Sequence, residues 1–471
     1  MSLKIKNTLT GKIEAFKSIK RGQISMYHCG PTVYKPAHIG NLRPFIFADF
    51  LRRYFKHQGY KVRQVINITD VGHLTSDSDE GEDKVEQEAK KSGIKARKIT
   101  EEITLRFMQD LEKLNVNLTE IIFPRATQYI NEQIILIEEL EKAGLTYKTS
   151  DGIYFNTGAI KNYGKLGQIN LAGLEEGARV GKNDEKKNPT DFALWKFSEP
   201  NIKREQEWQS PWGIGFPGWH IECSAMIKSI LGQPIDIHTG GIEHVSIHHN
   251  NEIAQSESTS NKKLSNYWVH LNHILINGEK MAKSDGNVVY LNDIKNPLAY
   301  KYWILTSHYS TQSNYTEEAM AAAEVAYKKL AQFIKKDLEK PETKNGTNIN
   351  LKNTSSKINK KYLEQFINHL NNDFDTPQAI ATIWLMLKDQ TLSYSDKRIT
   401  ALEMDKILGL NLENFIEQIH VIPAEITTLV EERRKARTEK DWVKSDEIRA
   451  RIEALGYAIK DTGDTYEVIT N

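Results

Sequence analysis

The chain has 471 residues, a length that predicts about two to four domains, each large enough to bury its own core. Its 63 Lys and Arg residues nearly balance its 62 Asp and Glu residues, so there is no overall basic field for non-specific binding of nucleic acid. Any RNA partner must therefore meet local basic patches. No stretch has the apolar core of a secretory signal or the length needed to span a bilayer, so we expect a soluble, cytoplasmic protein without a membrane partner.

The first predicted elements are a strand, a helix and a second strand. Ile24 to Cys29 predicts a short buried strand, and apolar residues at helical spacing then continue as far as Gly59. Val62 to Ile68 is rich in β-branched residues and predicts the second strand. This order is typical of an α/β fold with a parallel sheet, so residues 1–116 are predicted to form the first half of a Rossmann-like catalytic domain.

Residues 117–204 have a different residue pattern, in which short apolar runs are broken by Gly, Asn and Lys. This pattern predicts an inserted domain. The parallel-sheet pattern resumes with a strand at Pro234 to His238 and another at Ile274 to Ile276, which ends at the hairpin-type turn Asn277-Gly278. We therefore assign residues 205–290 to the second half of the Rossmann-like domain, which the insertion splits.

The last third of the chain is predicted to be mainly helical. Residues 291–316 form a connecting region, and residues 317–410 form a helical bundle that contains a polar, mobile loop at Glu339 to Lys361. Residues 411–471 predict a small domain with a basic helical segment at Ile426 to Leu455. Its mixed charges first suggest a solvated helix surface, but as a group its Lys and Arg residues can face RNA phosphates.

A phosphate site is predicted at His38-Ile39-Gly40-Asn41, where the first strand gives way to the first helix. Free backbone N–H groups and the helix dipole favour phosphate at such a place. His38 and Asn41 can donate hydrogen bonds to phosphate oxygens, and Gly40 lets an adenine ring approach the backbone. A histidine near a helix start is also a common cap or surface residue, and that alternative stays open.

A second loop with phosphate-binding chemistry follows the strand at Ile274 to Ile276. Its sequence is Lys280-Met281-Ala282-Lys283-Ser284. Two lysines three positions apart can clamp a polyphosphate that gains charge in the transition state. The simpler alternative is a solvated lysine loop.

The only two cysteines, Cys29 and Cys223, raise the question of a metal site. Nothing points to secretion, so metal binding or catalysis competes with two inert buried thiols rather than with a disulfide. His248 and Glu252 are four positions apart, which puts them on one face if the segment is helical. With the cysteines they make a possible zinc set. The alternative is a core thiol at Cys223 and an ordinary helix surface pair.

These segments resemble a known family. The two loops look like the His-Ile-Gly-His and Lys-Met-Ser-Lys-Ser signatures of class I aminoacyl-tRNA synthetases, with departures at Asn41 and Ala282 that remove no clamping group. Cys-Gly-Pro-Thr-Val-Tyr at 29–34, Gly-Trp-His-Ile-Glu-Cys-Ser-Ala-Met at 218–226 and His-His-Asn-Asn-Glu-Ile-Ala-Gln at 248–255 are similar to cysteinyl-tRNA synthetases. The resemblance spans nearly the whole chain, and residues 372–377 with the basic final segment look like that family's anticodon-side domains.

The resemblance implies a role for each group of residues. One Zn²⁺ ion per chain would be bound by four ligands: Cys29, Cys223, His248 and Glu252. The cysteine pocket would be lined by four further residues: Gly30, Thr32, Trp219 and His238. ATP, accompanied by Mg²⁺, would be bound by nine residues: His38, Gly40, Asn41, Gly241, Glu243, Lys280, Met281, Lys283 and Ser284. Glu243 stands where Asp is commoner, and His38, Asn41, Lys280 and Lys283 would be catalytic.

The implied reaction is the activation of L-cysteine by ATP and its transfer to the 3′ end of tRNA(Cys), by an enzyme that we expect to be monomeric. An apolar pocket separates serine from cysteine by only about one or two powers of ten, whereas zinc binds thiolate and leaves a hydroxyl protonated. Two thiolates and one carboxylate would leave the zinc site with one net negative charge. We therefore expect His220 or His238 to lie close enough to offset that charge.

Two other functions compete with this one. A related ligase could transfer cysteine to an amino sugar, but the long helical C-terminal third argues against so small an acceptor. A zinc-containing RNA-binding protein without catalysis is the alternative from another class. The presence of His38, Lys280 and Lys283 argues against it.

Overall fold

The structure is a computed structural model that describes residues 2–71, 83–168, 185–198, 204–281, 287–335, 342–344, 347–349, 356–415, 424–462 and 465–470. It divides into two compact units, Met1–Asn414 and Phe415–Asn471. Among the described helices, none combines the length and the apolar character that crossing a membrane requires.

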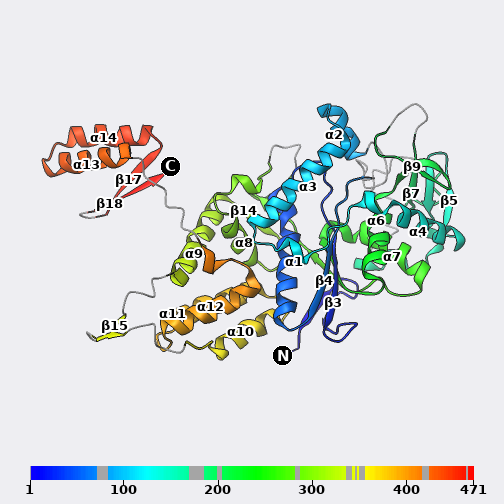
Figure 1. Cartoon of the computed structure of the whole chain (residues 1–471), viewed down its shortest axis with the longest axis horizontal. Coiled ribbons are helices and arrows are strands. Elements are labelled where there is room, and N and C mark those ends of the chain that lie inside the picture. Colours follow the sequence, from blue (N-terminus) through cyan, green and yellow to red (C-terminus); the bar gives the residue numbers. More distant parts are fainter. Residues whose placement is uncertain are drawn as a thin grey trace. The chain divides into compact units, whose positions relative to one another are not determined.

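A four-stranded parallel sheet lies at the centre of the first unit (Figure 1). Its spatial order is β11-β10-β3-β4, formed by Ser265–Leu271, Ile235–Gly241, Gln23–His28 and Lys61–Ile66. The chain adds strands outward from β3 to β4 and, in the other direction, from β10 to β11. The point at which the order reverses therefore lies between β3 and β10. In open α/β sheets, ligands bind outside the carboxyl ends of the strands at such a point.

Helix α1, Ile39–His57, connects β3 to β4 and begins at the carboxyl end of β3. Its buried face is mainly apolar and aromatic, which fits the apolar spacing seen in the sequence, but it also contains Arg43, Asp49 and Arg52. The predicted strand–helix–strand opening is thus present, and the strand bounds differ from the predicted ones by only one or two residues.

The strand predicted at Ile274 to Ile276 exists as β12, but its assignment to the parallel sheet was wrong. It belongs to a separate sheet of order β13-β12-β14, formed by Glu279–Lys280, Ile274–Ile276 and Ser313–Tyr315. On the side away from β3, the neighbour of β10 is β11, which was not predicted. The chain leaves β11 at Asn272 and His273, whose carbonyl groups accept hydrogen bonds of 2.8 and 3.2 Å from the buried Arg43 guanidinium. This contact with α1 fixes the short segment in which the chain passes from one sheet to the other.

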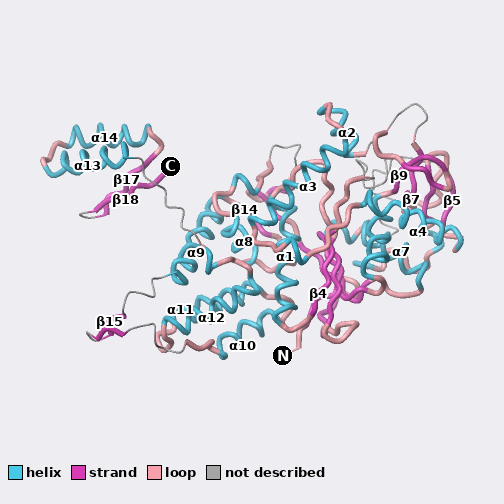
Figure 2. Tube along the Cα trace, in the orientation of Figure 1, coloured by secondary structure: helices cyan, strands magenta, loops and turns pink. Residues whose placement is uncertain are grey.

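The inserted segment forms an antiparallel sheet of order β5-β6-β7-β9-β8, separate from the central sheet in Figure 2. Its strands are Thr146–Lys148, Gly152–Phe155, Phe192–Phe197, Gly213–Pro217 and Trp208–Ser210, in that order. Helix α4, Ile130–Lys142, packs against it through Leu136, Ile137 and Leu140. The predicted domain boundary at residue 204 falls between β7 and β8 of this sheet. Helix α6, Trp219–Met226, follows β9 directly.

The remaining elements of the first unit are mostly helices. They are α2 Lys84–Ser92, α3 Ala96–Lys113, α7 His248–Ser260, α8 Pro297–Leu305, α9 Glu317–Lys335, α10 Lys360–Leu370, α11 Thr376–Lys388 and α12 Tyr394–Leu408, with a hairpin of β1 Lys4–Asn7 and β2 Lys12–Ala15. The polar segment predicted as a mobile loop lies partly outside the described residues. Its described part contains a short hairpin of β15 Glu342–Lys344 and β16 Thr347–Ile349.

Residue Phe374, between α10 and α11, packs its fully buried ring edge-on against Phe47, Phe50 and Tyr54 of α1, at centroid distances of 5.6–5.9 Å. The Tyr54 hydroxyl also donates a 2.6 Å hydrogen bond to Asn371. The helical bundle is thereby packed directly against the helix that begins at the site.

The second unit contains α13 Ala424–Thr438, α14 Trp442–Ala454 and the hairpin β17 Tyr457–Thr462 and β18 Thr465–Thr470. Its core contains Ile426, Leu429, Val430 and Ile448. The basic segment predicted at Ile426 to Leu455 is therefore two helices. The break follows from Lys440, which adopts a left-handed φ of 58°, and from Asp441, which caps α14.

Candidate active site and metal centre

A cavity of about 520 Å³ opens where β3 and β10 end, at the point where the strand order reverses. Predicted site residues from four separate segments line it. They are Cys29, Gly30, Thr32, His38, Gly40, Asn41, Trp219, Cys223, Gly241, Glu243, His248 and Met281. The structure thus brings together both ends of the predicted site, the nucleotide end and the thiol end.

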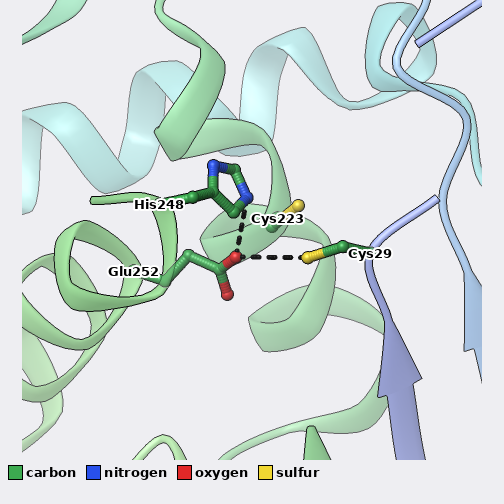
Figure 3. A group of neighbouring side chains, drawn as sticks. All are labelled: Cys29, Cys223, His248 and Glu252. Carbon is green, nitrogen blue, oxygen red and sulfur yellow. Dashed lines mark hydrogen bonds and ion pairs between the residues drawn. The ribbon is translucent and has the colours of Figure 1, made fainter. Parts of the chain in front are cut away.

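The four predicted metal ligands converge on one point (Figure 3). Cys29 follows β3, Cys223 lies in α6, and His248 and Glu252 lie one turn apart in α7. Their donor atoms all lie within 4.8 Å of one another, and all four side chains are buried. His248 Nε2 is 2.9 Å from Glu252 Oε1, and Cys29 Sγ is 3.7 Å from the same oxygen. Thiol, imidazole and carboxylate donors at this spacing fit a metal ion.

A second layer of histidines contacts three of these four residues. His238 Nε2 lies 2.7 Å from Glu252 Oε2, His249 Nε2 lies 3.1 Å from Cys29 Sγ, and His220 Nδ1 lies 2.9 Å from His248 Nδ1. His249 continues to His270 at 2.7 Å. Cys29, Glu252, His238 and His249 also form a group of possible metal donors within 4.8 Å, so the two groups share Cys29 and Glu252.

The buried donors differ in how they ionise: the pKa of Cys223 and that of Glu252 are lowered, whereas burial and the neighbouring Cys223 and Glu252 raise the pKa of Cys29. Burial alone would raise the pKa of the Cys223 thiol, but hydrogen bonds with Cys29 and His248 outweigh burial and lower it to about 6. Burial would lower the pKa of His248, yet its bonds to Cys223 and Glu252 raise it to about 10. The pKa of Glu252 is held well below its usual range, because His238 and His248 outweigh the effect of burial. Negative charge therefore lies on Cys223 and Glu252, next to the positively charged His248 ring.

The predicted nucleotide end is built on the first turn of α1. His38 is the N-cap residue: its Nδ1 accepts a 3.2 Å hydrogen bond from Asn41 N, and Asn41 Oδ1 accepts a 3.3 Å bond from His38 N. His38 thus has the capping role that the sequence left open, in addition to lining the cavity. A methyl group on Gly40 would lie 2.8 Å from Met281 Cε and 3.1 Å from the His38 ring, so Met281 covers this turn.

Some predicted site residues lie away from the cavity wall. Lys280 is exposed on the hairpin β12–β13 and is not among the lining residues, while Lys283 and Ser284 lie outside the described residues. His238 is fully buried behind the wall, where it contacts Glu252. The Glu243 carboxylate folds back over Gly241, and its Oε2 lies 3.6 Å from His273 Nδ1.

The lining residues that sequence reasoning missed include Asn67, Thr69 and His244, whose side chains can form hydrogen bonds. Asn67 Oδ1 accepts a 2.8 Å hydrogen bond from Gly30 N, and Asn67 Nδ2 donates to Thr69 Oγ1 at 3.0 Å. Both residues follow β4 directly. The end of a predicted parallel strand next to β3 was the signal that could have found them.

Comparison with known proteins agrees with this arrangement. Residues 15–325 match the family described as tRNA synthetases class I (C) catalytic domain, and residues 420–468 match the cysteinyl-tRNA ligase anticodon binding domain. Cysteine–tRNA ligase 1 of Burkholderia lata is 41% identical over 98% of this chain and 96% of its own. Cysteine–tRNA ligase of Treponema denticola is 40% identical over 98% of both chains.

The fold also has solved counterparts. A methionyl-tRNA synthetase of Mycobacterium tuberculosis, in complex with methionyl-adenylate, has a TM-score of 0.52 over 82% of this chain and 90% of that one, at 13% identity. This likeness confirms the predicted Rossmann-like class I fold, and at this identity it concerns the fold alone. On the matches of its catalytic and C-terminal segments and its near full-length relatives, the chain belongs to the cysteinyl-tRNA synthetase family of class I ligases.

Proposed function

We propose that this enzyme activates L-cysteine with ATP and transfers it to the 3′ end of tRNA(Cys), and that a Zn²⁺ ion selects the substrate thiol. The observation that carries the proposal is the convergence of four donors, Cys29, Cys223, His248 and Glu252, within 4.8 Å. The first three line a cavity that also reaches the first turn of α1. The thiol end and the nucleotide end of one small substrate can thus be held at once.

Zinc suits these ligands because two thiols, one imidazole and one carboxylate form a typical donor set for this ion. When bound, Zn²⁺ supplies a thiophilic centre that favours the substrate thiolate over the protonated hydroxyl of serine. The group with Cys29 and Cys223 is preferred to the one with His238 and His249, because it offers two soft thiolate donors.

Two neighbouring histidines can offset the excess negative charge of such a site. Two thiolates and a carboxylate carry one charge more than Zn²⁺ neutralises. His238 lies 2.7 Å from Glu252 Oε2 and His249 lies 3.1 Å from Cys29 Sγ, so each ring can donate an N–H to an outer lone pair of a ligand. We infer that these two rings orient the ligands and disperse the charge, as outer-shell partners do.

For the nucleotide, we propose that nine residues hold ATP with its Mg²⁺: His38, Gly40, Asn41, Gly241, Glu243, Lys280, Met281, Lys283 and Ser284. The first turn of α1 favours phosphate, and its capping bonds fix the His38 ring through Nδ1. His38 Nε2 is then the ring atom that can donate to a phosphate oxygen. Glu243 accepts from the ribose hydroxyls beside Gly241, and Gly30, Thr32, Trp219 and His238 shape the amino-acid end.

The reaction has two steps. A carboxylate oxygen of cysteine attacks the α-phosphorus of ATP, the bond to the β-phosphate breaks, and pyrophosphate leaves. A terminal ribose hydroxyl of the tRNA then attacks the acyl carbon, and AMP leaves. The residues His38, Asn41, Lys280 and Lys283 stabilise the charge on the phosphates by position, without a covalent enzyme intermediate.

We propose that the domains follow the predicted division. Its parts are 1–116 and 205–290 (catalytic), 117–204 (inserted), 291–316 (connecting), 317–410 (bundle on the anticodon side) and 411–471 (C-terminal). The match of residues 420–468 to an anticodon binding domain supports the last assignment and argues against an amino-sugar acceptor. We further propose that the enzyme is a cytoplasmic monomer.

Metal content and tRNA charging, measured on the same preparations, test this proposal. The enzyme as purified is expected to carry about one zinc per chain and to charge tRNA(Cys) with cysteine. Glu252→Gln is expected to lose most of its zinc and its charging activity. Glu257→Gln is the matched control, because Glu257 lies on the same helix and pairs with Lys165 away from the cluster. Zinc retained in full by Glu252→Gln would remove that ligand from the proposal.

A further inference from the structure

His244 is a cavity-lining histidine that belongs to neither the metal ligands nor the ATP set proposed above. It lies in a 3-10 turn, η6, formed by Ile242–Val245 between the end of β10 and the start of α7. Its neighbours in sequence are therefore Gly241 and Glu243 on one side and the ligand His248, one helical turn later, on the other.

The ring of His244 is fixed by packing on several sides. Its centroid lies 5.2 Å from those of His248 and His249, and 6.1 Å from that of Trp219 in an edge-on arrangement. A methyl group on Gly240 would lie 2.7 Å from His244 Nδ1, so the Nδ1 side of the ring rests on the Gly240 backbone. Glycine at position 240 is what gives the ring its room.

This packing determines which nitrogen can serve a ligand. Nδ1 is buried and has no hydrogen-bond partner among the described residues. A bound molecule therefore cannot reach Nδ1, and only Nε2 can contact it. In the tautomer that carries its proton on Nε2, this atom is a hydrogen-bond donor. His244 is half-buried and lines the cavity, so the Nε2–H group is available to a bound molecule.

The place of His244 lies between the two ends of the substrate. Trp219 and His248, on one side of its ring, belong to the thiol end, and Gly241 with Glu243 belong to the nucleotide end. The carboxylate of a bound cysteine must lie between these ends, because its thiol is held by the metal cluster while its oxygen bonds to the α-phosphorus. The N–H group of His244 at this place is within reach of that carboxylate.

We propose that Nε2 of His244 donates a hydrogen bond to the carboxylate of the bound cysteine and positions it beside the α-phosphate of ATP. This inference rests on the proposed arrangement of the site. His244 exchanges no proton in the step: one carboxylate oxygen forms the new bond to phosphorus, and the electron pair of the broken P–O bond leaves with pyrophosphate. The role is one of substrate positioning by a charge-assisted hydrogen bond.

Three substitutions at position 244 separate this role from packing. His244→Leu removes the donor, His244→Gln places an amide N–H near the position of Nε2, and His244→Asn places its amide near Nδ1. In cysteine-dependent ATP–pyrophosphate exchange, the Leu and Asn variants are expected to lose roughly 10-fold to 100-fold in kcat/KM for cysteine. The KM for ATP stays the same, and the Gln variant recovers part of the loss. Ile242→Ala, an exposed position in the same turn, is the matched control and keeps full activity.

A carboxylate-free probe makes the test specific. Cysteamine has the thiol and the amine of cysteine but no carboxylate, so its inhibition constant is expected to be equal for the unmodified enzyme and for His244→Leu. Equal weakening of cysteamine and cysteine would overturn the proposal in favour of a structural role at the thiol end. Full activity of His244→Leu, or a Gln variant no better than Leu, would overturn it as well. Exchange by the unmodified enzyme shows separately whether the proposed function itself holds.

Discussion

The Nε2 atom of His238 lies 2.7 Å from the Oε2 atom of Glu252, and both side chains are fully buried. The other carboxylate oxygen, Oε1, faces His248 and Cys29. His238 is itself held by a stacked contact with Trp268, at a centroid distance of 4.5 Å. The His238 ring therefore fixes the carboxylate so that its other oxygen, Oε1, points into the group of metal donors.

Replacing His238 by alanine is expected to weaken zinc binding by about 10-fold to 100-fold, because the carboxylate loses the donor that orients it. Cysteine binding, measured by titration on the same variant, should fall with it. Competition with a chelator measures the zinc affinity, and His369→Ala in α10 controls for the loss of an unrelated histidine. Unchanged zinc and cysteine affinities in His238→Ala would show that the contact has no influence on the metal centre.

Gly30 occupies a place where no side chain fits. A methyl group there would overlap the carbonyl oxygen of Asn67, a backbone atom that cannot move aside alone. We expect Gly30→Ala to reduce the free energy of unfolding by about 1–3 kcal/mol and to raise the KM for cysteine, since the ends of β3 and β4 must separate. Urea unfolding and exchange kinetics measure the two effects.

Gly40→Ala is the matched control for that substitution. The added methyl group would meet only the ends of the Met281 and His38 side chains, and position 40 is helical. Stability should therefore stay the same or rise by up to about 1 kcal/mol, while the KM for ATP rises. Similar losses of stability in both variants would contradict the difference drawn here between backbone and side-chain neighbours.

The buried Lys301 joins α8 to α1. Its Nζ lies 2.8 Å from Asp49 Oδ2 and donates a 2.9 Å hydrogen bond to Leu114 O. Lys301→Met is expected to lower the free energy of unfolding by roughly 3–5 kcal/mol, because it breaks a buried ion pair. Lys295→Met, at an exposed position two residues before α8 begins, should change it little. A loss of the same size in both variants would refute a special role for the buried pair.

The same pair gives a pH dependence with a defined sign. Burial alone would raise the pKa of Asp49, but Lys301, Arg53 and Arg52 outweigh burial and hold it below its ordinary value. The stability that Asp49 contributes is thus complete above the unfolded pKa of about 3.9 and is lost as the pH falls through the lower folded value. In Lys301→Met the folded pKa of Asp49 should move up toward the unfolded value, so this acid-side loss should be smaller than in the unmodified protein, as unfolding curves at a series of pH values would show.

The C-terminal unit should act on tRNA and not on activation. Lys435 and Lys444 are exposed on α13 and α14. Replacing both by glutamine is expected to weaken tRNA(Cys) binding several-fold and to reduce its salt dependence, because up to two phosphate contacts are lost. Cysteine-dependent pyrophosphate exchange needs no tRNA and should not change. A fall in exchange would contradict this separation of roles.

Much of the fold was predictable because β3, β4 and β10 are short, end in buried residues and, in β4 and β10, contain several β-branched residues. Strand β11 was not, because its polar residues Ser265, Asn266 and His270 interrupt the apolar pattern. Their partners come from elsewhere in the chain: His270 Nδ1 bonds to Thr8 Oγ1 at 2.8 Å, and Asn266 O accepts from Asn7 Nδ2 at 3.0 Å. Such tertiary bonds leave no periodic trace in the sequence.

The site shows the same division between local and tertiary information. The spacing of His248 and Glu252 predicted one helix face, and the 2.9 Å contact within α7 agrees. The places of Asn67 and His244 depend on segments meeting at the cavity, namely the end of β4 and the turn η6. Spacing within either segment alone could not predict that meeting.

The most direct test of the central claim is cysteine-dependent ATP–pyrophosphate exchange by the purified protein, with serine as the control substrate and zinc content determined in the same sample. The account predicts exchange with cysteine, none above background with serine, and about one zinc per chain, as a single four-ligand site requires. Zinc bound at that ratio without exchange would contradict the assignment of the cavity as the place where cysteine is activated.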